Sequence, residues 1–350
     1  MTLSNPVRRA FKRAGQSLST MLGPASISSA VSVPPESSGA SALPSDALSP
    51  LPATGGLNDR FDPALFTYQV NWRSVAYHAG AYLTRHQGAG SDFAGFSPLL
   101  ASPDPRRVDV RASLRSIPQQ LMVRTFLERG AIRVFALLDV SSSMQFEGMR
   151  DQRQQMTELA AAIAWSATRQ GDAFGLLAAD DSVQAALTIP TGYQQTLAQQ
   201  VATQCTRFWQ QRAAELQPCQ SAAMPQAAAS LGAQRALVFL ISDFYWSAEQ
   251  LARTLTACEG HDVVPLVLRD PAAFEQVPAF GWARVRDMET GQETGLMLRP
   301  ALQSRMHAHA KQQRALLSAT FARHGTRPPL WLAPQWRPEQ LSQHLLETCA

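Results

Sequence analysis

The chain has 350 residues, and its hydrophobic fraction of 45 % is typical of a soluble globular protein with room for two domains. Lysine occurs only as Lys12 and Lys311, and neither follows a glycine-rich loop or lies in an apolar stretch, which excludes a P-loop nucleotidase and a Schiff-base enzyme. The formal net charge of +4 comes from scattered arginines rather than from a basic stripe, so nucleic-acid binding is not expected.

The cysteines and the hydropathy indicate a reducing compartment and no membrane span. Cys205, Cys219, Cys258 and Cys349 form no CxxC pair, so we expect free thiols. A membrane helix needs about 18 consecutive apolar residues, and the chain has no such run. We therefore expect a cytoplasmic protein.

Residues 1–58 differ from the rest of the chain. The first 22 residues carry Arg8, Arg9, Lys12 and Arg13 with no acidic residue, and a tract rich in Ser, Ala and Pro follows. Few large apolar side chains are available for burial, which predicts a disordered tail. A basic amphipathic helix that touches a membrane surface or a partner, and a transit peptide, are the alternatives.

Residues 60–130 are predicted to form a small accessory region that contains β-structure. Apolar and aromatic residues over 68–75 indicate a short ordered element, and the glycines of 88–93 indicate a turn. Val108, Val110 and Ala112 alternate with charged residues, which predicts a half-buried strand.

From residue 131 onward, apolar runs alternate with amphipathic segments. The predicted strands are 132–138, 174–179, 235–241, 263–268 and 329–332, and the predicted helices are 151–169, 193–216, 247–258, 301–324 and 338–346. Pro265 indicates a bulge or an unpaired position in its strand. This alternation predicts an α/β fold over 131–350, with a doubly wound and mostly parallel sheet of the Rossmann-like kind.

Two of the predicted strands end in a carboxylate. Asp139-Val140-Ser141-Ser142-Ser143 follows the first strand, and Ser242-Asp243 follows the third. The carboxyl ends of parallel strands meet at one edge of the sheet, where ligands bind. Hard divalent cations prefer oxygen ligands, so Asp139, Ser141, Ser143 and Asp243 are candidate ligands for Mg²⁺, or for Mn²⁺ or Ca²⁺. Another acidic pair, Asp180-Asp181, is expected to lie in a solvated loop.

The DxSxS pattern, followed by Met144, resembles the metal-ion-dependent adhesion site of von Willebrand A domains. Asp243 matches the acidic residue of the third metal loop in such domains. The resemblance implies a second loop that offers a threonine after glycines. This chain has Gln217-Pro218-Cys219-Gln220-Ser221-Ala222 instead, where Ser221 could take the place of the threonine.

Residues 68–346 more closely resemble one branch, the domain-of-unknown-function 58 family. The stretches Arg107–Ser113, Met122–Glu128, Ile241–Phe244 and Asp287–Gly291 carry the likeness, whereas Ser97–Asp104 departs from the family pattern. Members are typically encoded beside MoxR-type AAA+ ATPases, which implies such an ATPase, or its client protein, as the partner.

Taken together, these features predict a metal-ion-dependent protein-interaction module and not an enzyme. The resemblance implies that a partner carboxylate completes the metal site, and that the chain is a partner or adaptor of the ATPase in assembly or maturation of another protein, such as a metalloprotein. A magnesium-dependent phosphohydrolase with Asp139 as nucleophile is one alternative, although the usual second acid two residues later is replaced by Ser141. A scaffold whose metal site is degenerate is the other.

Overall fold

The computed structural model describes residues 29–32, 63–75, 78–145, 149–215, 219–269, 280–287, 293–333 and 335–349. Most of the predicted tail and the turn at 288–291 therefore lie outside the described residues. Four residues of the tail, Ser29–Ser32, form strand β1, which pairs with β9 (Gly281–Asp287). These four residues lie within the segment that the sequence predicts to be disordered.

The central feature is a six-stranded sheet with the order β11-β8-β7-β4-β5-β6. Its strands are β4 (Arg133–Asp139), β5 (Ala173–Ala179), β6 (Ile189–Gly192), β7 (Leu237–Ser242), β8 (Asp262–Leu268) and β11 (Leu330–Leu332). Every pairing is parallel except that of β5 with β6. The predicted doubly wound, mostly parallel sheet is confirmed.

Pro265 lies inside β8 without a bulge. The register between β7 and β8 runs through Leu240 and Pro265 with no shift, so of the two predicted alternatives the structure has the unpaired position and not the bulge. The ladder between β8 and β11 begins only at Leu266. The proline, which has no N–H to donate, therefore lies just outside that ladder.

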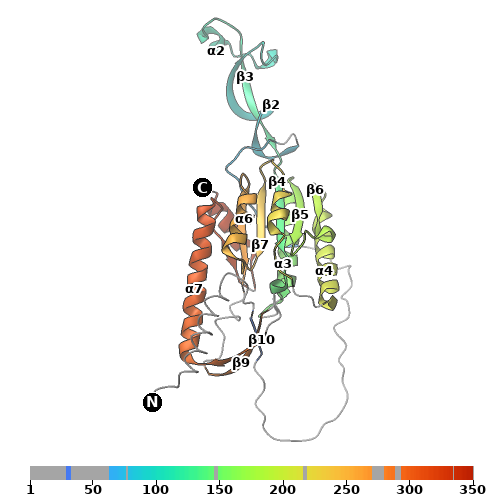
Figure 1. The fold of residues 1–350 in the computed structure, drawn as a ribbon. Coiled ribbons are helices and arrows are strands. Elements are labelled where there is room, and N and C mark those ends of the chain that lie inside the picture. The colour runs from blue at the N-terminus through green and yellow to red at the C-terminus, as the bar shows by residue number, and fades with distance from the viewer. Residues whose placement is uncertain are drawn as a thin grey trace.

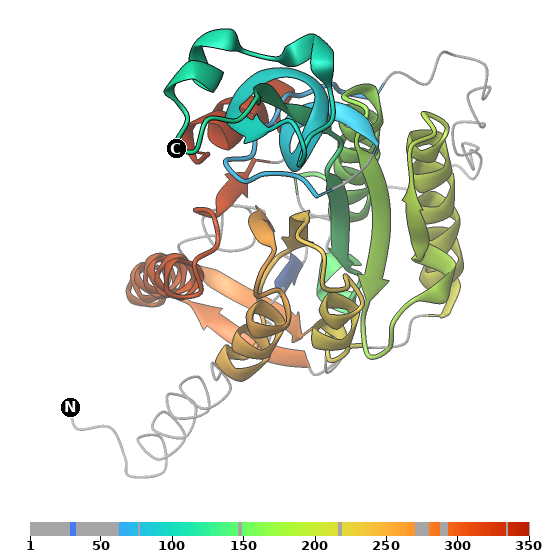
Figure 2. The ribbon, with the colours of Figure 1, turned by 90° about the horizontal axis from the view of Figure 1, so that it is seen from above.

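Helices cover both faces of the sheet (Figure 2). On one face lie α3 (Gln152–Arg169), α4 (Leu197–Glu215) and α8 (Pro338–Glu347), and on the other α5 (Met224–Ala229), α6 (Ala248–Ala257) and α7 (Pro300–Arg323). Side chains of β4 alternate between the two cores: Val134, Ala136 and Leu138 join the first, Phe135 and Leu137 the second. This double burial explains why the strand is a continuous apolar run.

The predicted accessory region has two structurally different parts. Residues 63–75 are extended and bury Phe66 and Tyr68 in the core that contains α3. β2 (Ala79–Pro98) and β3 (Met122–Gly130) form an antiparallel hairpin that projects beyond the start of β4 (Figure 1). The first part therefore belongs to the main body, and only the hairpin stands apart from it.

Two predictions within the hairpin are wrong. The segment at 108–112 is not a strand, because Val110–Arg115 form helix α2, after a 3₁₀ turn at Pro105–Arg107. Asp109 caps this helix by accepting a hydrogen bond from the Ala112 N–H at 2.9 Å. The predicted turn at 88–93 does not reverse the chain. Gln87 and Asp92 share Leu127 as a partner, so residues 88–91 bulge out of β2.

A second small sheet lies at the opposite end of the molecule from the hairpin (Figure 1). It consists of β1, β9 and β10 (Glu293–Leu298), and it was not predicted. β10 leads directly into the long helix α7. In the described part of the chain, every helix is too short or too polar to cross a lipid bilayer.

Candidate functional site

The two strand-ending carboxylates lie side by side, as the sequence predicts. Asp139 is the last residue of β4, and Asp243 directly follows β7, the neighbouring parallel strand, in which Ile241 pairs with Leu138. Both aspartates are almost completely buried, with 0 % and 1 % of their surface exposed. The sheet therefore brings both carboxylates to the edge where ligands of such folds bind.

Three hydrogen bonds fix the orientation of Asp139. Its Oδ1 accepts from the Ser141 N–H at 3.0 Å, while Oδ2 accepts from Ser242 Oγ at 2.7 Å and from Trp246 Nε1 at 2.8 Å. Sequence reasoning missed Ser242 and Trp246. Ser242 is the last residue of its strand, and its side chain points to the opposite face from that of Asp243. Its place beside the end of β4 could therefore have been predicted, whereas no sequence pattern pointed to Trp246.

The two predicted serine ligands connect the carboxylates. Ser141 Oγ and Ser143 Oγ are 3.1 Å apart, and the Ser143 hydroxyl hydrogen-bonds the Asp243 carboxylate. A 3₁₀ turn over Ser142–Gln145 produces this arrangement, with the Met144 N–H donating to the Ser141 carbonyl at 3.1 Å. Asp139, Ser141, Ser143 and Asp243 thus form one buried polar cluster.

The second loop is joined to the first by backbone contacts. The Ser142 N–H donates to the Cys219 carbonyl at 3.1 Å, and the Cys219 N–H donates to Ser142 Oγ at 2.8 Å. Ser221, two residues further on, is buried, and its carbonyl accepts from the Met224 N–H at 3.1 Å and from the Gln250 side chain. The segment with Ser221 therefore lies next to the DxSxS loop.

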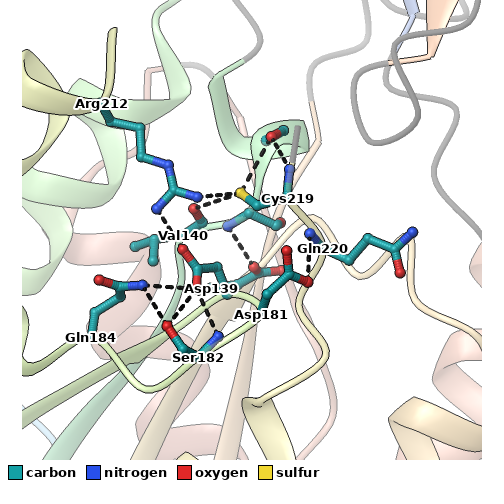
Figure 3. Close-up of polar contacts among 11 residues, drawn as sticks. Asp139, Val140, Asp181, Ser182, Gln184, Arg212, Cys219 and Gln220 are labelled. Atoms are coloured by element: carbon teal, nitrogen blue, oxygen red, sulfur yellow. Dashed lines mark hydrogen bonds and ion pairs between the residues drawn. The ribbon is translucent and has the colours of Figure 1, made fainter. Parts of the chain in front are cut away.

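This second loop is held in place by one arginine and by the two aspartates Asp180 and Asp181. Asp180 is buried and forms an ion pair with Arg212, which also contacts the Cys219 thiol (Figure 3). The prediction of a solvated acidic pair is therefore wrong for Asp180, whose carboxylate balances a partly buried arginine. Asp181 is exposed and accepts from the Gln220 N–H at 3.1 Å. Burial raises the pKa of the Cys219 thiol, which keeps it protonated.

The third loop is held through its backbone, which leaves the carboxylate of Asp243 available. Arg269 Nε donates to the Asp243 carbonyl at 2.6 Å, and its Nη2 donates to the Phe244 carbonyl at 2.9 Å. Phe244 has a φ of 53°, a left-handed conformation that is uncommon for an aromatic residue. Such local strain is often found at binding sites.

The cluster holds two buried carboxylates, and the nearby charge of Arg269 offsets the rise in the pKa of Asp243 only in part. Burial, and then the charge of Asp139, raise the pKa of Asp243 to about 6, and burial raises that of Asp139 as well. Asp243 Oδ2 is buried without a hydrogen-bond partner. In the described part of the chain, neither carboxylate forms an ion pair with a basic side chain. A buried oxygen with no donor beside a second carboxylate fits a divalent cation.

The chain was compared with known proteins. It matches the family model described as "Protein of unknown function DUF58" over residues 103–316. A Paracoccus denitrificans protein described as "Uncharacterized protein in moxR 3'region" is 34 % identical over 95 residues, which is 27 % of this chain and 90 % of that protein.

Two solved structures are distantly similar. BatB from Bacteroides thetaiotaomicron has 14 % identity and a TM-score of 0.38, covering 62 % of this chain and 98 % of its own. A von Willebrand factor type A protein from Catenulispora acidiphila has 12 % identity and a TM-score of 0.28, covering 64 % and 43 %. The family model spans more than half of the 350 residues, and the chain therefore belongs to the DUF58 family.

Proposed function

We propose that the chain is a metal-ion-dependent protein-interaction module, and a partner or adaptor of a MoxR-type AAA+ ATPase in the assembly or maturation of another protein. The observation that carries this proposal is the buried Oδ2 of Asp243, which has no hydrogen-bond partner and lies beside a second buried carboxylate. Leaving such an oxygen unpaired is costly. A bound cation would remove this cost.

The proposed ligands are Asp139, Ser141, Ser143 and Asp243, with Ser221 as a further donor. Two carboxylates balance the charge of one divalent ion, and the hydroxyls add neutral oxygens. Mg²⁺ suits this small set because it retains several waters, while Mn²⁺ and Ca²⁺ are the other candidates. A carboxylate of the partner would take the place of one water, so that the ion becomes part of the interface.

The proposed partner is supported by the relative whose printed name places it in the region 3′ of moxR. An ATP-driven partner works where ATP is present, so the proposal includes a cytoplasmic location. The proposal also treats the chain as a binding protein rather than an enzyme.

The first experiment measures the ion itself by calorimetric titration with Mg²⁺ and Mn²⁺. We expect weak binding to the wild type and none to Asp243→Asn. Asp172→Asn is the matched control, because Asp172 is a buried aspartate beside the start of β4, at the opposite edge of the sheet, and its Oδ1 accepts from the Ile132 N–H at 2.8 Å. Equal ion affinity in Asp243→Asn and wild type would contradict the proposed site.

The second experiment measures the complex with the MoxR-type ATPase from the same genome. Chelation is not diagnostic because an ATPase binds its own magnesium nucleotide, so substitutions in this chain are needed. We expect Asp139→Asn to weaken the complex and Asp172→Asn to leave it unchanged. Linkage requires the ATPase to tighten Mg²⁺ binding by the same factor by which Mg²⁺ tightens the complex. An unchanged affinity in folded Asp139→Asn would show that the cluster is not the interface.

A further inference from the structure

The outer end of the β2–β3 hairpin exposes large aliphatic side chains. We call residues 99–121 the hairpin tip. Leu100 is 96 % exposed, Ile117 98 %, Leu114 70 % and Val110 67 %. Neither the 3₁₀ turn at Pro105–Arg107 nor helix α2 contains a buried residue. A group of exposed apolar residues of this kind marks an interaction surface.

The tip owes its shape to polar contacts and not to these aliphatic side chains. Asp109 caps α2 and also forms an ion pair with Arg124 of β3. Ser113 Oγ accepts from the Met122 N–H at 2.8 Å, and the N–H of Leu99 donates to the carbonyl of Leu121 at 2.8 Å. The fold of the tip therefore does not account for its apolar residues, and binding is the remaining physical reason for them.

The tip also carries uncompensated positive charge. Its only acidic residues, Asp104 and Asp109, each form an ion pair with an arginine. Arg106, Arg111 and Arg115 are exposed and form no ion pair with a described residue. The surface is therefore basic as well as apolar.

Apolar and basic side chains lie on adjacent faces of α2. Val110 and Leu114 are four residues apart and share one face of the helix, and Arg111 and Arg115 share the adjacent face. Arginine can place its long apolar stem beside hydrocarbon while the guanidinium reaches a polar layer. The arrangement thus suits a boundary between an apolar phase and an anionic one.

We propose that the hairpin tip docks on the surface of an anionic phospholipid bilayer. Leu114 and Ile117 would enter the acyl boundary, and the arginines would lie among the phosphates. Figure 1 shows the tip at the far end of the hairpin, away from the body of the protein, so a flat surface can reach it without meeting the main sheet. The candidate metal site lies at the opposite end of β4, away from the tip.

The test is flotation of the full chain with lipid vesicles, with chelator present throughout so that no divalent ion bridges protein and lipid. We expect binding to vesicles of equal parts phosphatidylcholine and phosphatidylglycerol, and little binding to phosphatidylcholine alone. Leu114→Asp and Ile117→Asp should each weaken the binding by at least about tenfold. Arg111→Gln should weaken it about fivefold.

Matched substitutions elsewhere provide the controls. Leu316 is an exposed leucine of α7, 53 % exposed, and Arg305 is an exposed arginine of the same helix. Leu316→Asp and Arg305→Gln should bind vesicles as the wild type does. The basic residues of the first 22 positions are present in every variant, so their contribution cancels in each comparison.

Two results would overturn the proposal. The first is equal vesicle binding by the tip variants and the α7 variants. The second is a loss of ATPase binding in Leu114→Asp without any effect on vesicles, which would assign the tip to a protein partner instead. Circular dichroism and Mg²⁺ titration of each variant verify that the fold and the candidate metal site are intact.

Discussion

Asp172 and Asp243 are both buried carboxylates, and they differ in how their oxygens are satisfied. Asp172 Oδ2 accepts from Tyr68 Oη at 2.6 Å and Oδ1 from the Ile132 N–H at 2.8 Å, so each oxygen has a donor. The Asp243 carboxylate accepts from the Ser143 hydroxyl and, through Oδ1, from the Tyr245 N–H at 3.2 Å, whereas Oδ2 has no hydrogen-bond partner. The oxygens of Asp172 are therefore satisfied within the fold, whereas Asp243 has one oxygen that a ligand could bind.

Asp172 gives a prediction for the effect of pH on stability. Burial raises its pKa to about 6, compared with about 3.9 in an unfolded chain. The folded state therefore holds the proton more tightly. The stabilisation from protonated Asp172 is complete below the unfolded pKa and is lost as the pH rises toward 6. Between pH 5 and pH 7 we expect the free energy of unfolding to fall by about 1 kcal/mol through this group.

The measurement is urea unfolding at both pH values in an Asp243→Asn background, where Asp243 cannot titrate. Adding Asp172→Asn should remove about 1 kcal/mol of the pH-dependent loss. An identical pH dependence in the single and double variants would show that the pKa of Asp172 is not raised.

At the scale of elements, the junction between the hairpin and the body is a close backbone crossing. The Ala131 N–H donates to the His78 carbonyl at 2.8 Å, and Ser74 Oγ donates to the Ala131 carbonyl at 2.5 Å. A Cβ added at Gly80 would lie 2.3 Å from the Ala131 nitrogen and 2.4 Å from its Cα. Only glycine fits at this position, because backbone atoms cannot move aside as a flexible side chain can.

We therefore expect Gly80→Ala to destabilise the protein by about 1–3 kcal/mol. Gly295→Ala is the control, because Gly295 is also a strand glycine and a Cβ there meets nothing within 4 Å. Denaturant unfolding of the two variants checks the prediction. If both lose the same small amount of stability, the crossing is looser than the structure shows.

The elements that were predicted well are those that bury a whole strand or one face of a helix in the core. The run that forms β4 and the buried pair Leu341 and Leu345 of α8 could be identified because hydrophobic periodicity records burial. α2 was mistaken for a strand because Val108, Val110 and Ala112 alternate with charged residues, and because a helix of six residues with no buried side chain is too short to show a helical period. β2 was missed because glycines and a four-residue bulge remove the alternation that identifies a strand.

The candidate site was predictable in part. The two aspartates and the DxSxS serines follow predicted strands, so strand topology alone brings them together. The hydrogen bond from Trp246 to Asp139, and the ion pair of Asp180 with Arg212, depend on how loops fold back on each other. Sequence spacing does not record such contacts.

At the scale of the whole molecule, we propose binding rather than phosphate chemistry for the site. Three donors already hold the carboxylate of Asp139. Magnesium-dependent phosphohydrolases with an aspartate nucleophile usually have a second acid two residues later, and that position is Ser141 in this chain. We expect the protein with Mg²⁺ or Mn²⁺ to hydrolyse neither phosphate monoesters nor nucleotides. A phosphate-release assay measures this, with Asp139→Asn as the comparison. Turnover by the wild type that disappears in Asp139→Asn would establish an enzyme.

The base of the hairpin also bears on how chains of this kind can diverge. Tyr82 and Leu83, near the base, still hydrogen-bond to the body. Further out, Phe93 and Phe126 are partners in the ladder, so the chain beyond them leaves and returns at a single place. Partners in an antiparallel ladder have Cα atoms about 5 Å apart, a gap that a two-residue turn closes. The part of the hairpin beyond Phe93 and Phe126 can therefore be replaced as a unit. Its length can change, or another tip can replace it, while the carboxylates at the far edge of the sheet keep their geometry.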